Sequence, residues 1–254
     1  MPTNWILYVV PALLIATRLS GLMLIAPFLG ADAIPPRVKA ALVMALTAVF
    51  LPTAAPALPH ATMLTWMADA VSELMIGLLL GLVVKVVFEA VQLAGDVAGF
   101  QLGLSLESSI DPTSAANSTV LATLHQLVVL YVFLQLGVHR WVLLGLASSF
   151  VALPLGSSLA SLSPPQLLSF VGNLFVWGLE LALPVLIATL AIDVALGFFA
   201  KAAPQLPVIF VGIPVKALVG YGVLMAALRF WPPILAHHFN DALSFFLQHT
   251  HRIT

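Results

Sequence analysis

The chain of 254 residues contains no cysteine, and charged residues make up only 7% of it. Without cysteine it has no disulfide, no thiol nucleophile and no cysteine-bound metal. Soluble domains carry about 25% charged residues, so this chain does not have the surface of one. Its formal net charge is -1, and no basic patch is present that could neutralise the phosphates of a nucleic acid.

Hydrophobic residues dominate the composition instead. They account for 61% of the chain, and the mean hydropathy is +1.12. Long apolar runs separated by short polar or proline-rich stretches predict an all-α, polytopic membrane protein of long, kinked helices. No basic residue precedes the first apolar run, and Arg18 interrupts it, so we expect that this run is not a cleaved signal peptide.

Apolar runs predict five to seven helices. The expected segments are Trp5–Leu29, Ala40–Ala57, Met63–Gly103, Val120–Val138 with a continuation over Val142–Leu155, Gln166–Ala200 and Val208–Trp231. The stretch after Pro232 and Pro233 is interpreted as a short tail of mixed character. Within the third segment, Val71 to Leu104 alone would form a helix of roughly 50 Å, longer than a hydrocarbon core of about 30 Å. Such a helix has to tilt, break or project beyond the membrane.

Four polar residues lie inside the third segment, at Lys85, Glu89, Gln92 and Asp96. Their spacing places them on one stripe of one helix face. Charges in mid-bilayer are costly, so we expect this polar stripe to face protein, from this chain or another, and not lipid. Two roles are open: a structural role, in which the charges pair, and a proton-responsive role.

A polar loop follows the stripe. Three glycines at four-residue intervals, from Gly95 to Gly103, form a ridge that another backbone can approach closely. Ser105 to Thr119 is then rich in Ser, Thr, Asn and Asp, and Asp111-Pro112 is a turn signal. Such a segment can lie at membrane depth only where protein encloses it or where it lines a wet cavity. It either lies in such an enclosed site or connects two helices outside the membrane.

Several isolated cations lie within or beside the apolar segments. Arg18 in the first segment is either paired within the helical bundle or in contact with a partner subunit. Arg37 and Lys39 favour a cytoplasmic first loop, but the later loop expected on the same side carries only acids. We therefore do not expect a simple serpentine topology. Lys201 and Lys216 are further candidate subunit contacts.

Motifs for catalysis are missing. The sequence has no H-E-x-x-H metal pair, no G-x-S-x-G nucleophile elbow and no glycine-rich phosphate loop. His237, His238 and Asp241 have a spacing that a metal could use, but few other ligands lie nearby, and we interpret them as interfacial polar residues. His125 is alone on an apolar helix and is interpreted as a hydrogen-bonded packing residue. The sequence thus predicts neither an enzyme nor a bound cofactor.

Two non-enzymatic classes remain open on composition alone. A secondary transporter would use broken helices and buried charges, such as Pro184, Pro214, Glu180 and Asp193, to build a site at mid-membrane. A structural subunit of a larger channel would instead use its glycine ridges and isolated charges to contact sibling subunits. Stability of the isolated chain in mild detergent would favour the transporter.

Three blocks of sequence resemble the FliR family of flagellar export-gate proteins. They are RLSGLMLIAPFLGADAIPPRVKAAL (Arg18 to Leu42), EAVQLAGDVAGFQLGLSLESSIDPTSAANS (Glu89 to Ser118) and LGFFAKAAPQLPVIFVGIPVKALVG (Leu196 to Gly220). They follow the order found in the family and together span most of the chain. Virulence-type secretion systems carry a related subunit, but the K-x-A-P-Q-L-P form is more similar to the flagellar one. Phe199 stands where smaller aliphatic residues are commoner.

The resemblance implies a structural, non-enzymatic subunit of the flagellar type III export gate. Such a subunit lies in the bacterial inner membrane at the flagellar basal body. With FliP-like and FliQ-like siblings it would form the channel through which unfolded flagellar proteins are exported, while other chains supply the energy. Residues 1–254 would form one subunit resembling a tandem, FliP-like to about residue 185 and a FliQ-like hairpin from about residue 186.

The resemblance also implies residue roles. A loop of the family's subunit helps to plug the closed pore, and the matching segment is the polar loop. The residues assigned to the plug are Gly103, Ser105, Glu107, Ser108, Ser109, Ile110, Asp111, Pro112, Thr113 and Asn117. The residues assigned to subunit contacts are Arg18, Arg37, Lys39, Lys201 and Lys216, with the polar stripe Lys85, Glu89, Gln92 and Asp96. The remaining alternatives are a small-solute transporter and the equivalent subunit of a virulence system.

Overall fold

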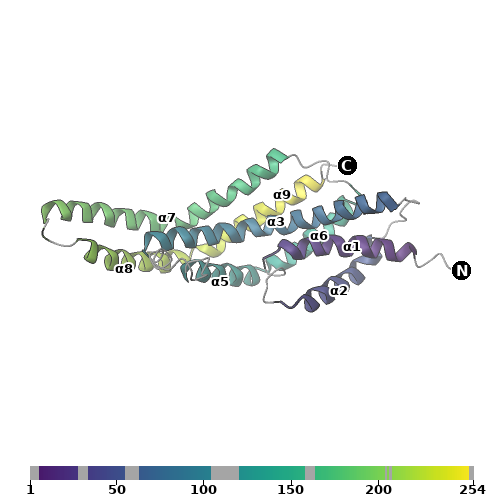
Figure 1. The fold of residues 1–254 in the computed structure, drawn as a ribbon, viewed down its shortest axis with the longest axis horizontal. Helices are drawn as coiled ribbons and strands as arrows, with labels where there is room; N and C mark the ends of the chain where they lie inside the picture. Colours follow the sequence, from purple (N-terminus) through teal and green to yellow (C-terminus); the bar gives the residue numbers. More distant parts are fainter. Residues whose placement is uncertain are drawn as a thin grey trace. The chain divides into compact units, whose positions relative to one another are not determined.

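A computed structural model describes residues 6–27, 34–54, 63–103, 120–157, 164–203, 205 and 208–251. Across these ranges the regular structure is helical, without a strand (Figure 1). The helices are α1 (Ile6–Ile25), α2 (Pro36–Ala54), α3 (Met63–Gln101), α5 (Val120–Gln135), α6 (Val138–Ala152), α7 (Pro164–Ala202), α8 (Val208–Leu228) and α9 (Trp231–His251). The predicted all-α membrane class is confirmed.

The last helix differs from the prediction. The stretch after Pro232 and Pro233 was expected to be a short mixed tail, but Trp231–His251 forms the 21-residue helix α9. Pro232 and Pro233 occupy its first turn, where proline removes no hydrogen bond that the helix needs and its fixed φ favours the helix. The proline pair therefore begins a helix here. With α9, the described ranges hold eight helices, more than the five to seven expected.

Four helices are long and apolar enough to cross a membrane. They are Tyr8–Ile25 of α1, all of α3, all of α7 and Val211–Leu228 of α8. The pair α5 and α6, bent by 66° at residues 136–137, makes a possible fifth. Gly137 at this bend has a φ of 67°, a left-handed conformation that glycine adopts without a steric penalty. α3 and α7 have 39 residues each, about 58 Å of helix, so the expectation of helices longer than the hydrocarbon core is confirmed.

The chain divides into two compact units. Unit 1 comprises Met1–Val86, Leu136–Val171 and Phe239–Thr254. In it α1 and α3 run in the same direction, since Gly77 of α3 lies against Arg18 and Gly81 lies against Leu22. α6 runs the opposite way along α3, because Gly145 approaches Leu80 and Gly156 meets Asp69. The rings of Phe50 in α2 and Phe150 in α6 lie 5.4 Å apart, which fixes α2 to α6.

Unit 2 comprises Val87–Gln135 and Gly172–His238. The end of α3 packs on α5, where the rings of Phe88 and Phe133 meet edge to face at 5.5 Å. α7 also touches α3, because a Cβ at Gly178 would lie 2.9 Å from the carbonyl oxygen of Ala90. α8 runs back along α7, with Gly212 against Leu196. Both 39-residue helices are thus followed by a returning helix within this unit.

α7 continues without interruption through Pro184 and across residues 185–186. The expected division of the chain at about that point therefore falls inside one helix. Residues 158–163, between α6 and α7, lie outside the described ranges.

Candidate functional site

A buried arginine lies at the centre of unit 1. Arg18 has 0% exposure and donates from Nε to Glu73 Oε2 at 2.5 Å. Its Nη1 donates to the Ser149 hydroxyl and its Nη2 to the Leu153 carbonyl oxygen, each at 3.0 Å. The guanidinium carbon also lies 4.4 Å from the centre of the Phe150 ring, a cation–π contact. One side chain therefore joins α1, α3 and α6.

Glu73, which the sequence analysis did not identify, completes this network. Its Oε1 accepts a hydrogen bond of 3.1 Å from the backbone N–H of Gly156, in the turn after α6. Gly156 has a φ of 85°, so a side chain there would be strained. Each charge is costly in an apolar surrounding unless it is paired and hydrogen-bonded, and both conditions are met here. The arrangement agrees with Arg18 paired inside the bundle and disagrees with Arg18 as a subunit contact.

Glycines make this pairing possible because they let α1 and α3 approach closely. A Cβ at Gly77 would collide with the carbonyl oxygen of Arg18, and a Cβ at Gly21 would lie 2.5 Å from that of Leu74. Gly81 is also tight, with 3.0 Å to the Leu22 oxygen. Gly77 and Gly81 form a G-x-x-x-G motif, the signal in the sequence that could have located this contact.

The polar stripe on α3 is half-buried at all four positions, Lys85, Glu89, Gln92 and Asp96. Gln126 of α5 donates from Nε2 to Gln92 Oε1 at 2.6 Å, so Gln92 faces another helix of unit 2. For the other three residues, the expectation that the stripe faces protein stays a prediction.

The polar loop begins where α3 ends. Gly103 has a φ of 79°, and its N–H donates to the Phe100 carbonyl oxygen at 3.1 Å, so this glycine closes the last turn. The other residues assigned to the plug, from Ser105 to Asn117, lie outside the described residues. The plug assignment therefore remains a prediction.

The remaining cations differ in their surroundings. Lys216 of α8 donates to Asp193 of α7 at 2.9 Å, and 18% of its side chain is exposed against 45% for Asp193. This ion pair links α7 to α8, and we call these two helices the arm. Arg37 and Lys201 are exposed and Lys39 is half-buried. Arg37 and Lys201 are therefore more accessible to another molecule than Lys39 is.

The histidines pack against aromatic rings. His238 is 3% exposed, stacks on Trp177 with ring centres 4.7 Å apart, and lies 3.3 Å from Glu180. It is thus buried between α7 and α9 in unit 2, and its interpretation as an interfacial residue is wrong. His125 is buried and packs against Trp231 at 4.8 Å, as expected for a packing residue. Within the described part of the chain, no group of three or more His, Cys, Asp or Glu residues could hold a metal.

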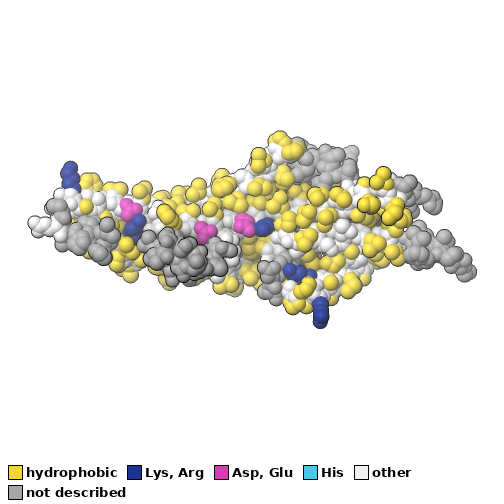
Figure 2. All heavy atoms as spheres, viewed as in Figure 1, with side chains coloured by type: hydrophobic (Ala, Val, Ile, Leu, Met, Phe, Trp, Pro, Cys, Tyr) yellow, Lys and Arg dark blue, Asp and Glu magenta, His cyan; other side chains and the backbone are white. Residues whose placement is uncertain are grey.

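These features define the class. The chain is an all-α polytopic membrane protein in which several charges pair internally and much of the apolar surface of α7 and α8 is not covered by other parts of the chain. Only 22% of the candidate membrane span in α7, and the same share of the span in α8, is buried. Figure 2 shows hydrophobic side chains over most of the visible described surface, with few charged groups among them. Residues 9–242 match the family described as bacterial export proteins, family 1, and the chain belongs to this family.

The relatives are flagellar biosynthetic proteins named FliR. The protein of Escherichia coli K12 is 33% identical over 231 residues, which cover 88% of this chain and 86% of that protein. The Caulobacter vibrioides protein is 23% identical over 238 residues, 92% of this chain and 95% of its own length. The Bacillus subtilis protein is 28% identical over 123 residues, about half of each chain. The resemblance found in the three sequence blocks is therefore confirmed.

Family membership decides among the open classes. The chain is a subunit of the flagellar type III export apparatus. It is a structural component and not an enzyme. The alternatives of a small-solute transporter and a virulence-system subunit are not favoured. The buried charges and the exposed arm are therefore features of a chain that works within an assembly.

Proposed function

We propose that this chain forms part of the wall of the export channel together with FliP-like and FliQ-like siblings, in the bacterial inner membrane. The observation that carries the proposal is the uncovered apolar surface of α7 and α8. Phe198 on α7 and Leu218 on α8 are 71% and 78% exposed. Exposed apolar surface of this extent marks an interface with protein or lipid.

The charges of the arm support a protein partner for part of this surface. The Lys216–Asp193 pair lies on an arm that is otherwise almost entirely apolar, and Asp193 keeps 45% of its side chain exposed. An exposed carboxylate is costly against hydrocarbon and favourable against a polar or basic group of another subunit. Lys216, Lys201, Arg37 and Lys39 are thus the proposed contacts with sibling subunits.

The polar loop from Gly103 to Thr119 is proposed to plug the closed pore. Ser, Thr and Asn side chains can bond their own backbone and that of neighbouring copies. They also present little apolar surface to an unfolded chain in transit. The left-handed Gly103 ends α3 and starts this loop, so the plug would extend directly from the helix that carries the polar stripe.

The tandem organisation is also part of the proposal, with its division moved to the connection at residues 158–163. The part before it would be FliP-like, and α7 with α8 and α9 would form the FliQ-like hairpin. This division keeps α7 whole. It also keeps together the contacts of α7 with the returning helices, Asp193 with Lys216 and Phe170 with Phe245, whose rings lie 4.3 Å apart.

Basic residues support an orientation. Arg37 and Lys39 lie in the first turn of α2, and His139 and Arg140 lie in the first turn of α6. Both helices belong to unit 1. Lys and Arg collect on the cytoplasmic side of membrane proteins, so we propose that the starts of α2 and α6 lie toward the cytoplasm.

Co-purification tests the proposed assembly. The tagged chain is expressed with its FliP-like and FliQ-like siblings, extracted in mild detergent and isolated through the tag. The expected result is a stable complex that contains all three chains. Recovery of this chain alone, folded and free of both siblings, would contradict the proposal. Solute uptake by the chain alone in liposomes would instead support the alternative that the chain is a small-solute transporter.

A further inference from the structure

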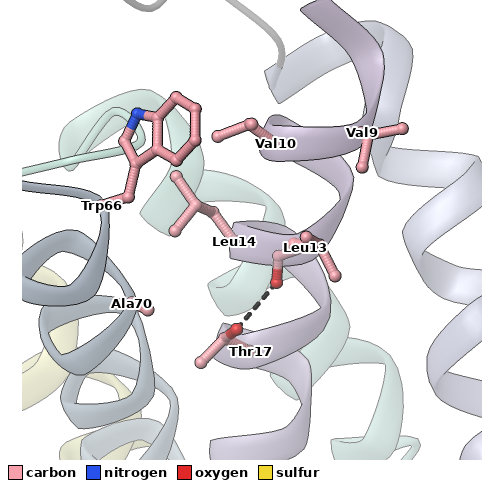
Figure 3. Close-up of a pocket in the computed structure, with 7 residues that line it drawn as sticks. All are labelled: Val9, Val10, Leu13, Leu14, Thr17, Trp66 and Ala70. Carbon is pink, nitrogen blue, oxygen red and sulfur yellow. Dashed lines mark hydrogen bonds between the residues drawn. The ribbon is translucent and has the colours of Figure 1, made fainter. Parts of the chain in front are cut away.

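An apolar cavity of about 350 Å³ lies within unit 1, between α1 and the first turns of α3. The residues that line it are Val9, Val10, Leu13, Leu14, Thr17, Trp66 and Ala70. Figure 3 shows the indole ring of Trp66 extending toward Val10, with Leu14 below the ring and Ala70 on the α3 side. We propose that this cavity binds one acyl chain of a membrane phospholipid.

The lining accepts a hydrocarbon and offers little to a polar ligand. Among the described residues, no charged one lines the cavity. The Thr17 hydroxyl donates to the Leu13 carbonyl oxygen of its own helix at 2.7 Å, so its donor is already used (Figure 3). The indole N–H of Trp66 is the other polar group of a lining side chain. A ligand with a charged group inside the cavity would lose its hydration without compensation.

The position of the cavity indicates what surrounds it. Five of its seven lining residues lie within Tyr8–Ile25, a candidate membrane span. Its lining residues Val9 and Leu13 are 41% and 63% exposed, so the cavity opens on the surface of α1. We expect lipid chains to reach this opening. Trp66 stands in the first turn of α3, and tryptophan is enriched at the level of the headgroups. The lipid would therefore enter with its headgroup on the Trp66 side.

The cavity lies between two helices and is lined by side chains of both α1 and α3. A narrow, flexible chain fits the space. A single side chain from a neighbouring subunit would also fit, and the experiment has to separate these two occupants.

Photo-labelling in living cells tests the site in the assembled protein. Cells that express the full chain are fed a fatty acid bearing a diazirine, which they build into phospholipid. After illumination, the chain is purified and the labelled peptides are mapped by mass spectrometry. The expected result is label concentrated on residues 9–17 and 66–70. Label spread evenly along the exposed apolar helices, or absent from these two stretches, would overturn the proposal.

Ala70→Phe provides the specific variant because its ring would fill the cavity. It is expected to remove the label from both stretches. Val71→Phe is the matched control, since Val71 is the next residue, is 57% exposed and does not line the cavity, and its label should equal wild type. Ala70→Leu serves if the larger ring lowers the amount of protein. Retention of full label in Ala70→Leu and Ala70→Phe, or label that appears only when the siblings are absent, would overturn the lipid assignment.

Discussion

Arg18 and Glu73 lie 55 residues apart in the sequence and form an ion pair in which neither side chain is exposed. The pair fixes α1 to α3, and the further bonds of Arg18 to Ser149 and Leu153 add α6. Each residue alone would be a buried charge in an apolar helix. The fold of unit 1 and the burial of this pair therefore depend on each other.

Breaking the pair from one side should destabilise the protein strongly. Glu73→Gln leaves the Arg18 guanidinium buried without its counter-charge, a loss of about 3–5 kcal/mol. Replacing both residues, as Arg18→Met with Glu73→Leu, removes the unpaired charge and should recover much of that loss. The measurement is the unfolding temperature in detergent, with exposed Arg37→Gln as the control. An unfolding temperature for Glu73→Gln equal to wild type would refute this account of unit 1.

The close approach of α1 and α3 predicts a contrast among glycines. Gly77→Ala would place a methyl group against the backbone carbonyl of Arg18, and overpacking of this kind costs about 1–3 kcal/mol. Gly172 and Gly222 have no atom within 4 Å of an added Cβ. Alanine there should stabilise its helix by up to about 1 kcal/mol. Thermal unfolding of the three variants checks the order, and equal effects at all three positions would show that the helices are not in close contact at Gly77.

The exposed arm predicts an effect on assembly without an effect on folding. If a sibling covers Phe198, Phe198→Ala should weaken the complex by about 2 kcal/mol or more, as aromatic anchors in interfaces do. The control is Leu64→Ala, which lies on α3, outside the proposed contact surface, and is 77% exposed. Recovery of siblings with the tagged chain is measured at equal amounts of chain. Unchanged recovery for Phe198→Ala would indicate that lipid, not protein, covers this position.

The plug proposal predicts a leak. Removing Ile110 to Asn117 should leave the complex assembled but make the membrane permeable to ions and small solutes. An aqueous connecting loop would instead give either failed assembly or no change. Conductance of cells or proteoliposomes that contain the assembled variant is the measurement. A tight membrane around a fully assembled deletion variant would rule out the plug.

The sequence predicted the spans well because their signal is local. Apolar runs placed α1, α3, α7 and α8 within a few residues, since hydropathy depends on neighbouring residues alone. α9 was missed because Pro232 and Pro233 were interpreted as the end of structure. In a sequence, a proline pair in the first turn of a helix looks the same as a proline pair that follows a helix. Only the packing contacts of the next helix distinguish the two cases.

The partner of Arg18 could not be found from spacing. Arg18 requires a counter-charge, but the chain has ten acidic residues, and nothing near Glu73 marks it as the one. What selects Glu73 is the parallel packing of α1 on the G-x-x-x-G face of α3. Similarly, His238 was interpreted as an interfacial polar residue, whereas stacking on Trp177 buries it. Long-range packing decides both cases.

Secretion of flagellar proteins into the medium tests the central claim, that this chain is a structural subunit of the export channel. The gene is deleted cleanly and then restored on a plasmid, and hook and filament proteins are measured in the culture medium and in the cells. The account predicts that the deletion abolishes secretion while the proteins are still made, and that the restored gene recovers it. Normal amounts of filament protein in the medium of the deletion strain would contradict the account.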